Sequence, residues 1–168
     1  MALRQNVDKS RRSGLETVID WQADDKLNIT FNASYLSTNV KQFIGANGEA
    51  INNVEHIFSP RWIINPSMIF TPSSKWSINL SGRYVSESFM ELSNDSEFEL
   101  PGFFVLDSRV NFEVSETVTF SFIVNNILDE RYFTDGSPVD LDYDGIVEGP
   151  GYRIQPPRNF YGMLRVRF

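Results

Sequence analysis

The sequence of 168 residues contains no cysteine and one histidine, His56. The absence of cysteine excludes disulfide bonds, thiolate metal sites and cysteine nucleophiles. With one histidine, neither a metal cluster nor a catalytic dyad built on histidine is expected. No apolar run approaches the roughly 18 residues of a transmembrane helix. The first residues, MALRQNVDKSRRSG, also lack the apolar core of a signal peptide, so any export signal is expected to lie elsewhere.

Positive charge is scarce as well. Lysine and arginine number 15 against 22 aspartates and glutamates, which gives a net charge of -7. A nucleic-acid-binding protein would carry a basic face, so nucleic acid is not an expected partner. The sequence has neither a glycine-rich phosphate loop nor a nucleophile elbow, and its serines lack a base partner. We therefore do not expect an enzyme.

What the sequence does contain is apolar residues at every second position, the period of a β-strand with one apolar face. About seven strands are predicted, at residues 13–23, 27–35, 61–71, 76–84, 105–114, 117–125 and 159–168. The stretch 61–71 fits least well, because Pro66 removes a backbone donor and Ile63 shares its face with Asn65. The fold class predicted is all-β and antiparallel.

The connections between these strands alternate between short and long. Residues 24–26, 73–75 and 115–116 are expected to form tight turns, whereas 38–58, 88–102 and 126–158 are long segments rich in turn-forming residues. A compact soluble domain rarely tolerates three such long loops. Outer-membrane barrels have this asymmetry, with short periplasmic turns and long extracellular loops.

Aromatic residues are placed at both ends of the apolar faces. Trp21 and Trp76 lie beside short turns, at the level of Phe168, and Tyr35 and Tyr84 lie at the far ends. This distribution predicts two aromatic belts at the two interfaces of a lipid bilayer. The opposite faces are polar and are predicted to line an aqueous or plugged interior. Alternation alone also fits a large soluble antiparallel sheet with one solvated face.

The final decapeptide, NFYGMLRVRF, shows the same division. Phe160, Leu164, Val166 and Phe168 fall on the apolar side and are expected to contact lipid. A charge on the lipid face costs about 2–4 kcal/mol near the midplane. The arginines on the other faces are therefore predicted to point into the interior: Arg83, Arg109, Arg165 and Arg167.

Three segments carry a family resemblance: KSRRSGLE (residues 9–16), NNILDERYF (125–133) and PPRNFYGMLRVRF (156–168). In this order and spacing they resemble the C-terminal barrel strands of TonB-dependent outer-membrane receptors. The resemblance implies an antiparallel transmembrane β-barrel segment in the outer membrane of a Gram-negative bacterium. It further implies a parent receptor that binds a scarce nutrient, such as a ferric siderophore, cobalamin or a glycan, and imports it through TonB and a plug domain. It also implies that the barrel-assembly machinery reads Phe160, Leu164, Val166 and Phe168.

The sequence departs from this family in length. Members of the family have an N-terminal plug, a TonB-engaging motif and a barrel of 22 strands. About seven strands is an odd count, whereas single-chain bacterial barrels use even numbers. We therefore expect residues 1–168 to be a single C-terminal unit of a larger barrel, without the plug and the earlier strands. Two alternatives remain: a soluble β-sandwich for binding or adhesion, and a complete small barrel of about eight strands.

Two groups of charged residues are open to interpretation. The interior arginines could attract an anionic ligand or contact a plug, but pairing with Asp107 and Glu113 is the simpler expectation. In the last long loop, DLDYDGIVEG resembles the start of a calcium loop. Its candidate ligands are Asp140, Asp142, Asp144 and Glu148, although a solvated acidic loop is the favoured interpretation of these residues. No other cofactor is expected.

Overall fold

A computed structural model describes residues 9–45, 48–141 and 147–168. It contains strands and one short 3-10 helix, and no helix in these residues is long and apolar enough to cross a membrane. The elements are, in chain order, β1 (Ser10–Gln22), β2 (Leu27–Ile44), β3 (Ala50–Val54), β4 (Trp62–Ser73), β5 (Trp76–Val85), β6 (Ser88–Phe89), η1 (Ser96–Phe98), β7 (Glu99–Leu100), β8 (Phe103–Ser115), β9 (Val118–Asn125), β10 (Phe133–Val139), β11 (Gly149–Ile154) and β12 (Asn159–Val166).

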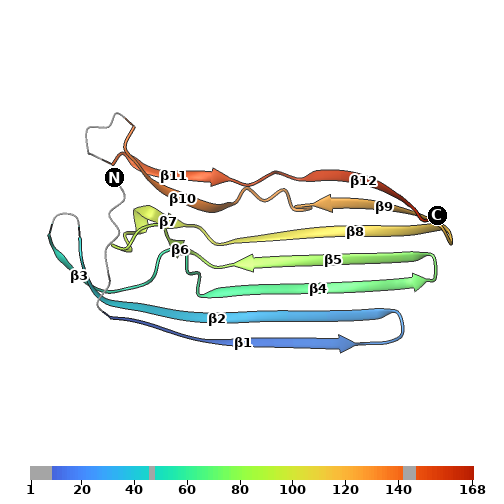
Figure 1. Cartoon of the computed structure of the whole chain (residues 1–168), viewed down its shortest axis with the longest axis horizontal. Helices are drawn as coiled ribbons and strands as arrows, with labels where there is room; N and C mark the ends of the chain where they lie inside the picture. Colours follow the sequence, from blue (N-terminus) through green and yellow to red (C-terminus); the bar gives the residue numbers. More distant parts are fainter. Residues whose placement is uncertain (1–8, 46–47, 142–146) are drawn as a thin grey trace.

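Seven long strands form one antiparallel sheet in the order β1-β2-β4-β5-β8-β9-β12 (Figure 1). The short strand β3 pairs with the far part of β2, and this eighth strand lies off the main path. The prediction of about seven long antiparallel strands is confirmed. In the described residues the sheet is open, and β1 and β12 form its two edges.

The two ends of the sheet differ as the loop lengths predict. The tight turns β1–β2, β4–β5 and β8–β9 lie at one end together with the C-terminus, and the long connections lie at the other (Figure 1). In the first turn the Asp24 carboxylate accepts the backbone N–H of Lys26 at 2.7 Å and that of Leu27 at 2.9 Å. Aspartate side chains commonly stabilise tight turns in this way. We call the two ends the turn end and the loop end.

The long segments contain short strands that the sequence analysis did not predict. Strand β2 continues to Ile44 and pairs with β3, while β6–β7 and β10–β11 form two further hairpins. These hairpins pack on one another, so that Met90 and Leu100 are only 4% exposed. The sequence analysis did not identify these hairpins, because their pairing depends on contacts between segments far apart in the sequence. Strand β12, in turn, ends at Val166, two residues earlier than predicted.

Strand β4 forms in spite of Pro66. Strand β4 pairs with β5 in the same register before and after this residue, at Ile64–Tyr84 and at Ser67–Ser81, although the ladder is interrupted between these pairs. The missing donor therefore weakens the sheet locally without shifting it. Gly82 of β5 makes room for the ring, since a Cβ there would lie 3.0 Å from Pro66 Cγ.

Candidate functional site

The register of the seven strands places their apolar residues on one face of the sheet. Trp21 pairs with Ile29, Ile29 with Met68, and the same parity continues across every long strand to Leu164 on β12. Because directly paired residues share a face, these side chains form a continuous surface, which we call the apolar face. Between the aromatic levels the described strands place no charged side chain on it.

Aromatic rings lie at both ends of the apolar face. Trp76 begins β5 and Tyr84 lies one residue before its end. At about 3.3 Å per residue the two lie about 26 Å apart along the strand. For a strand tilted by about 40°, this corresponds to about 20 Å along the membrane normal. That separation is comparable with the apolar band of an outer-membrane barrel, about 25 Å tall. Trp21 is 58% exposed at the turn end, and Tyr35 is 38% exposed at the loop end.

Trp62 belongs to the same surface and was missed by the sequence analysis. Its ring lies 4.8 Å from that of Tyr35, between centroids, and it is the Cα partner of Tyr35. The signal was present, because one face of β4 is apolar throughout: Trp62, Ile64, Pro66, Met68 and Phe70. The two isoleucines on the other face obscured it.

The terminal strand carries its predicted stripe on the apolar face. Phe160 and Leu164 are 60% and 64% exposed, and Val166 is also exposed. Phe168 lies beyond the end of β12 and is fully exposed. These four side chains leave a row of apolar groups on the edge strand, and their recognition by assembly machinery stays a prediction.

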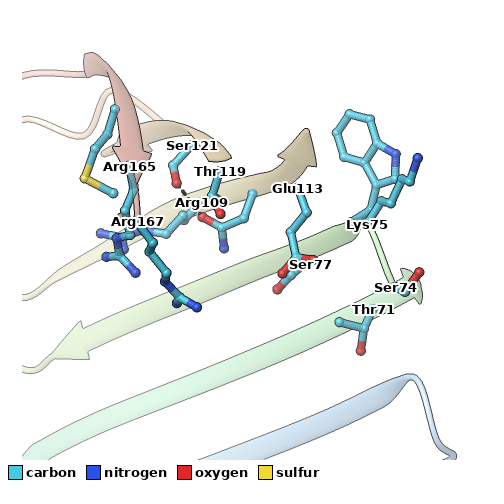
Figure 2. A pocket seen from close by; sticks show the side chains of 13 residues that line it. Thr71, Ser74, Lys75, Ser77, Arg109, Glu113, Thr119, Ser121, Arg165 and Arg167 are labelled. Atoms are coloured by element: carbon cyan, nitrogen blue, oxygen red, sulfur yellow. Dashed lines mark hydrogen bonds between the residues drawn. The ribbon is translucent and has the colours of Figure 1, made fainter. Parts of the chain in front are cut away.

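The opposite face, which we call the polar face, contains a basic hollow at the turn end (Figure 2). Its volume is about 280 Å³. Arg109 comes from β8, Arg165 from β12 and Arg167 from the residues just after it. Its lining also includes Thr71, Ser74, Lys75, Trp76, Ser77, Asn111, Glu113, Thr119, Ser121 and Met163. We call it the turn-end hollow.

The interior arginines are not paired as expected. The ion pairs in the described part of the chain are Arg61–Glu55, Arg153–Asp135 and Arg158–Asp129, all near the loop end. Asp107 instead accepts the backbone N–H of Asn126 at 2.7 Å. The expectation that Asp107 and Glu113 neutralise these arginines was wrong, because neither carboxylate lies within 4 Å of a nitrogen of any described arginine.

Arg83 is separated from the other three arginines and lines a second hollow, at the loop end of the polar face. This loop-end hollow, of about 230 Å³, is mostly apolar and aromatic. Its walls come from the sheet and from three loop segments: Phe58, Pro60, Ile63, Arg83, Val85, Ser86, Ser88, Leu100, Pro101, Phe103, Phe133 and Thr134. One cation among aromatic rings can bind an anionic ligand with an apolar body.

Aromatic stacking holds the walls of the loop-end hollow together. The rings of Phe103 and Tyr132 lie 4.6 Å apart, as do those of Phe133 and Tyr152. Tyr152 also donates its hydroxyl to the carbonyl of Glu99 at 3.1 Å, joining β11 to β7. The hollow is therefore built between segments that the sequence analysis treated as separate loops.

The segment NNILDERYF folds into a compact corner after β9. The Asn126 side chain accepts the N–H of Glu130 at 2.9 Å and donates to the Glu130 carbonyl at 2.9 Å. Asp129 accepts the N–H of Arg158 at 2.9 Å, and Arg158 donates to the carbonyl of Ile127 at 3.1 Å. Both Asn126 and Asp129 have positive φ, 52° and 56°, which asparagine and aspartate tolerate better than most residues. These contacts fix the entry to β12.

The connection between β3 and β4 carries two perturbed groups. Burial, with a smaller contribution from Arg12, lowers the pKa of His56, whose Nε2 has no hydrogen-bond partner among the described residues. The hydrogen bond from Arg61 to Glu55 raises the pKa of that arginine. Neither group lies beside a second histidine or a nucleophile arranged for catalysis.

The structure describes two of the four candidate calcium ligands, Asp140 and Glu148. Asp142 and Asp144 lie outside the described residues, while Glu148 accepts the N–H of Leu141 at 2.7 Å. Asp140 also lies in this loop, and no group of three acidic or histidine side chains suited to a metal occurs among the described residues. Calcium binding stays a prediction.

Comparisons with solved structures give the same architecture. The ferric yersiniabactin uptake receptor FyuA from Yersinia pestis matches 95% of this chain with a TM-score of 0.74 at 18% identity. The ferric citrate transporter FecA matches 95% with a TM-score of 0.74 at 23% identity. The siderophore receptor PiuA from Acinetobacter baumannii matches 92% with a TM-score of 0.73 at 16% identity. At these identities the likeness shows the fold.

The chain spans 24%, 24% and 21% of the lengths of those three proteins. Comparison with curated proteins gave no match. The family described as TonB dependent receptor-like, beta-barrel matches residues 2–127, which is three quarters of the chain. The chain therefore belongs to the TonB-dependent receptor-like β-barrel family of Gram-negative outer-membrane proteins.

Proposed function

We propose that this chain forms the C-terminal strands of an outer-membrane receptor that binds a scarce nutrient at the loop end and imports it in a TonB-dependent manner. Residues 1–168 would form one unit, and the plug and earlier strands would belong to the rest of the receptor. The observation that carries the proposal is the pair of faces on one sheet. One face of the sheet is apolar and bounded by aromatic rings, as a lipid-facing surface would be, and the opposite polar face contains a hollow at its loop end.

The loop-end hollow supports a binding role. Arg83 supplies one positive charge beside the rings of Phe103 and Phe133, and these are the groups that orient an anionic ligand with an apolar body. Ferric siderophores are the favoured class, since FyuA is a ferric yersiniabactin uptake receptor and PiuA is a siderophore receptor. Cobalamin or a glycan remain second candidates. Transport rather than catalysis is proposed because no described cluster combines a nucleophile with a base.

The proposal is tested on the protein purified from outer membranes in detergent. Calorimetric titration with a panel of ferric siderophores, cobalamin and glycans should give saturable binding of one class. Arg83→Gln should weaken that binding about tenfold, whereas Lys41→Gln, which removes a charge on β2 outside the hollow, should not. Uptake of the labelled ligand should require TonB. Equal uptake in cells without TonB would refute the proposal.

We also propose that the barrel-assembly machinery recognises the exposed row on β12 that ends in Phe168. Phe168→Ser should lower the amount of heat-modifiable protein in the outer membrane, because the terminal ring is accessible to a partner. Leu141→Ser, which changes a 73% exposed apolar residue in a loop, is the matched control. Equal membrane levels of the two variants and the unmodified protein would contradict this role.

A further inference from the structure

Three cationic residues lie together on β1 and β2, beyond the loop end of the apolar face: Lys9, Arg11 and Lys41, which we call the basic cluster. We propose that the basic cluster binds the phosphate groups of a phosphorylated glycolipid in the outer leaflet of the membrane. The cluster lies on the side of the sheet that faces lipid, opposite the barrel interior. The inference therefore depends neither on the nutrient nor on whatever fills the interior.

The register of β1 and β2 determines the side on which the cluster lies. The two strands stay paired without interruption from the turn end to Ser10–Val40, well beyond the last pair of β2 with β4 (Figure 1). Lys41 follows Tyr35 in β2 by an even number of positions, so both side chains point to the same side. Arg11 is related in the same way to Leu15, the partner of Tyr35. The cluster therefore continues the apolar face outward.

The described residues do not neutralise the basic cluster. The backbone N–H of Lys41 donates to the carbonyl of Lys9 at 3.0 Å, so two like charges lie opposite each other. Like charges at opposed positions destabilise a sheet, and a bound anion removes that repulsion. The ion pairs among the described residues involve other arginines. The carboxylate of Glu55, in the connection after β3, is itself held by Arg61.

The cluster is also open to lipid. All three of its side chains are exposed. Lys41 lies between β1 and β3, because β3 pairs with β2 at Val40 and at Gln42 on either side of it. A further strand joined to β1 would extend the sheet sideways, since ladder hydrogen bonds run in the plane of the sheet, and would leave this face uncovered.

The height of the cluster selects the kind of lipid. Arg11 lies four residues beyond Leu15, which corresponds to about 10 Å along the membrane normal for a tilted strand. Lys41 lies about 15 Å beyond Tyr35 by the same measure. The headgroup layer of a bilayer is only about 5–8 Å thick on each side. The cluster therefore fits phosphates carried on a larger headgroup, such as a sugar, and its long side chains can reach back toward the membrane.

The residues beneath the cluster complete a surface for such a lipid. The rings of Tyr35 and Trp62 lie 4.8 Å apart, and amphipathic rings of this kind settle at the level of the headgroups. Only the small polar pair Ser13–Ser37 separates this level from Arg11 on β1. A lysine supplies a point charge and an arginine a planar fork of donors, both of which bind phosphate oxygens. One lipid can thus contact the rings below and the cations above.

The test titrates lipid into the fluorescently labelled protein, which is purified from outer membranes in detergent and washed free of bound lipid. The probe is phosphorylated lipopolysaccharide, and the matched ligand is the same preparation after its phosphates are removed with hydrofluoric acid. Saturable binding of the probe is expected, at least tenfold tighter than that of the matched ligand. Equal binding of the two would overturn the proposal. Equal binding of phosphatidylglycerol would indicate an ordinary phospholipid site and would overturn the assignment to a glycolipid.

Two adjacent arginines of β1 locate the site. Arg11→Gln should raise the dissociation constant for the probe about fivefold, the effect expected of one cation near an anionic lipid surface. Arg12→Gln makes the same change on the other face, opposite Thr38, and should leave the constant within twofold. An equal loss in both variants would indicate general charge attraction and overturn the site. Lys41→Gln should weaken lipid binding but not nutrient binding, so the failure of either proposal can be told from the failure of the other.

Added charge covers the case in which the variants that lose a cation do not fold. Ser37→Lys places a further cation on the cluster side of β2, at an exposed position just above the rings, and should tighten binding of the probe about threefold. Gln42→Lys adds the same charge at an exposed position on the opposite side of β2 and should have no such effect. Tightening by both substitutions, or by neither, would overturn the assignment.

Discussion

Asp107 on β8 and Asn126 at the end of β9 are joined by a hydrogen bond in which the backbone N–H of Asn126 donates to Asp107 Oδ1 at 2.7 Å. Asn126 is only 4% exposed and has a φ of 52°. The carboxylate therefore satisfies a buried donor at a strained point of the chain, where water cannot replace it. The side chain of Asn126 then holds the turn that leads toward β10.

Replacing Asp107 by alanine should lower the free energy of unfolding by about 1–2 kcal/mol, because it leaves that N–H without an acceptor. Asp107→Asn should cost less, since the amide oxygen can still accept. The measurement is urea unfolding in detergent micelles, followed by tryptophan fluorescence. If Asp107→Ala unfolds at the same urea concentration as the unmodified protein, the bond does not stabilise the corner.

The packing of the loop hairpins depends on Gly136. A Cβ at this position would collide with Met90 Sδ and lie 2.8 Å from the carbonyl oxygen of Gly151. Gly136→Ala should push Met90 out of its buried position and loosen β10–β11 from β6–β7, at a cost of about 1–3 kcal/mol. Limited proteolysis should then cleave the loop end faster.

Gly162→Ala is the matched control for that substitution. A Cβ at Gly162 would meet the ring of Phe120 at 3.8 Å, which is an ordinary contact. Its cleavage rate and stability should stay close to those of the unmodified protein. Equal cleavage of the two alanine variants would show that the hairpins are not held together through Gly136.

The loop between β3 and β4 should be sensitive to acid through His56. Its pKa lies below the ordinary 6.5 because its ring is desolvated, with Arg12 adding repulsion. The unfolded loop then binds a proton more readily than the folded loop, so stability is complete above pH 6.5 and falls as the pH drops through the lowered pKa. Hydrogen exchange of residues 52–61, corrected for its intrinsic pH dependence, should rise between pH 7.5 and pH 5. His56→Gln should remove that rise, and an unchanged rise in the variant would exclude His56 as its cause.

The faces of the long strands could be predicted from the sequence because a strand repeats every two residues. In β5 the residues Trp76, Ile78 and Leu80 are apolar and their neighbours Ser77 and Asn79 are polar, so local sequence determines the orientation. In β4 the alternation of apolar and polar residues is less clear, because Ile63 and Ile69 add apolar groups to the polar face. The register with β2, in which Trp62 pairs with Tyr35 and Met68 with Ile29, shows which side of β4 belongs to the apolar face.

The structure of the loop end and the partners of the arginines could not be predicted in this way. Met90 is buried against a glycine 46 positions later in the chain, and Glu99 is bonded to Tyr152 across 53 positions. Likewise, Asp107 accepts a backbone N–H from a residue 19 positions later in the chain and forms no ion pair with a described arginine. Such contacts depend on the register of distant strands, which local periodicity does not contain.

The assignment of lipid to the apolar face is tested by two adjacent residues in the middle of β5. Leu80 lies on the apolar face, paired with Met68 and Ser108, and Ser81 lies on the polar face, paired with Ser67 and Asp107. Leu80→Arg should cost about 2–4 kcal/mol in a bilayer, because the guanidinium would meet hydrocarbon near the midplane. Ser81→Arg should cost less than about 1 kcal/mol, since its charge points toward the interior near Asp107. The measurement is unfolding in lipid vesicles with heat-modifiable migration as the readout. If Ser81→Arg were the more damaging change, the polar face would contact the membrane and the orientation of the whole sheet would be reversed.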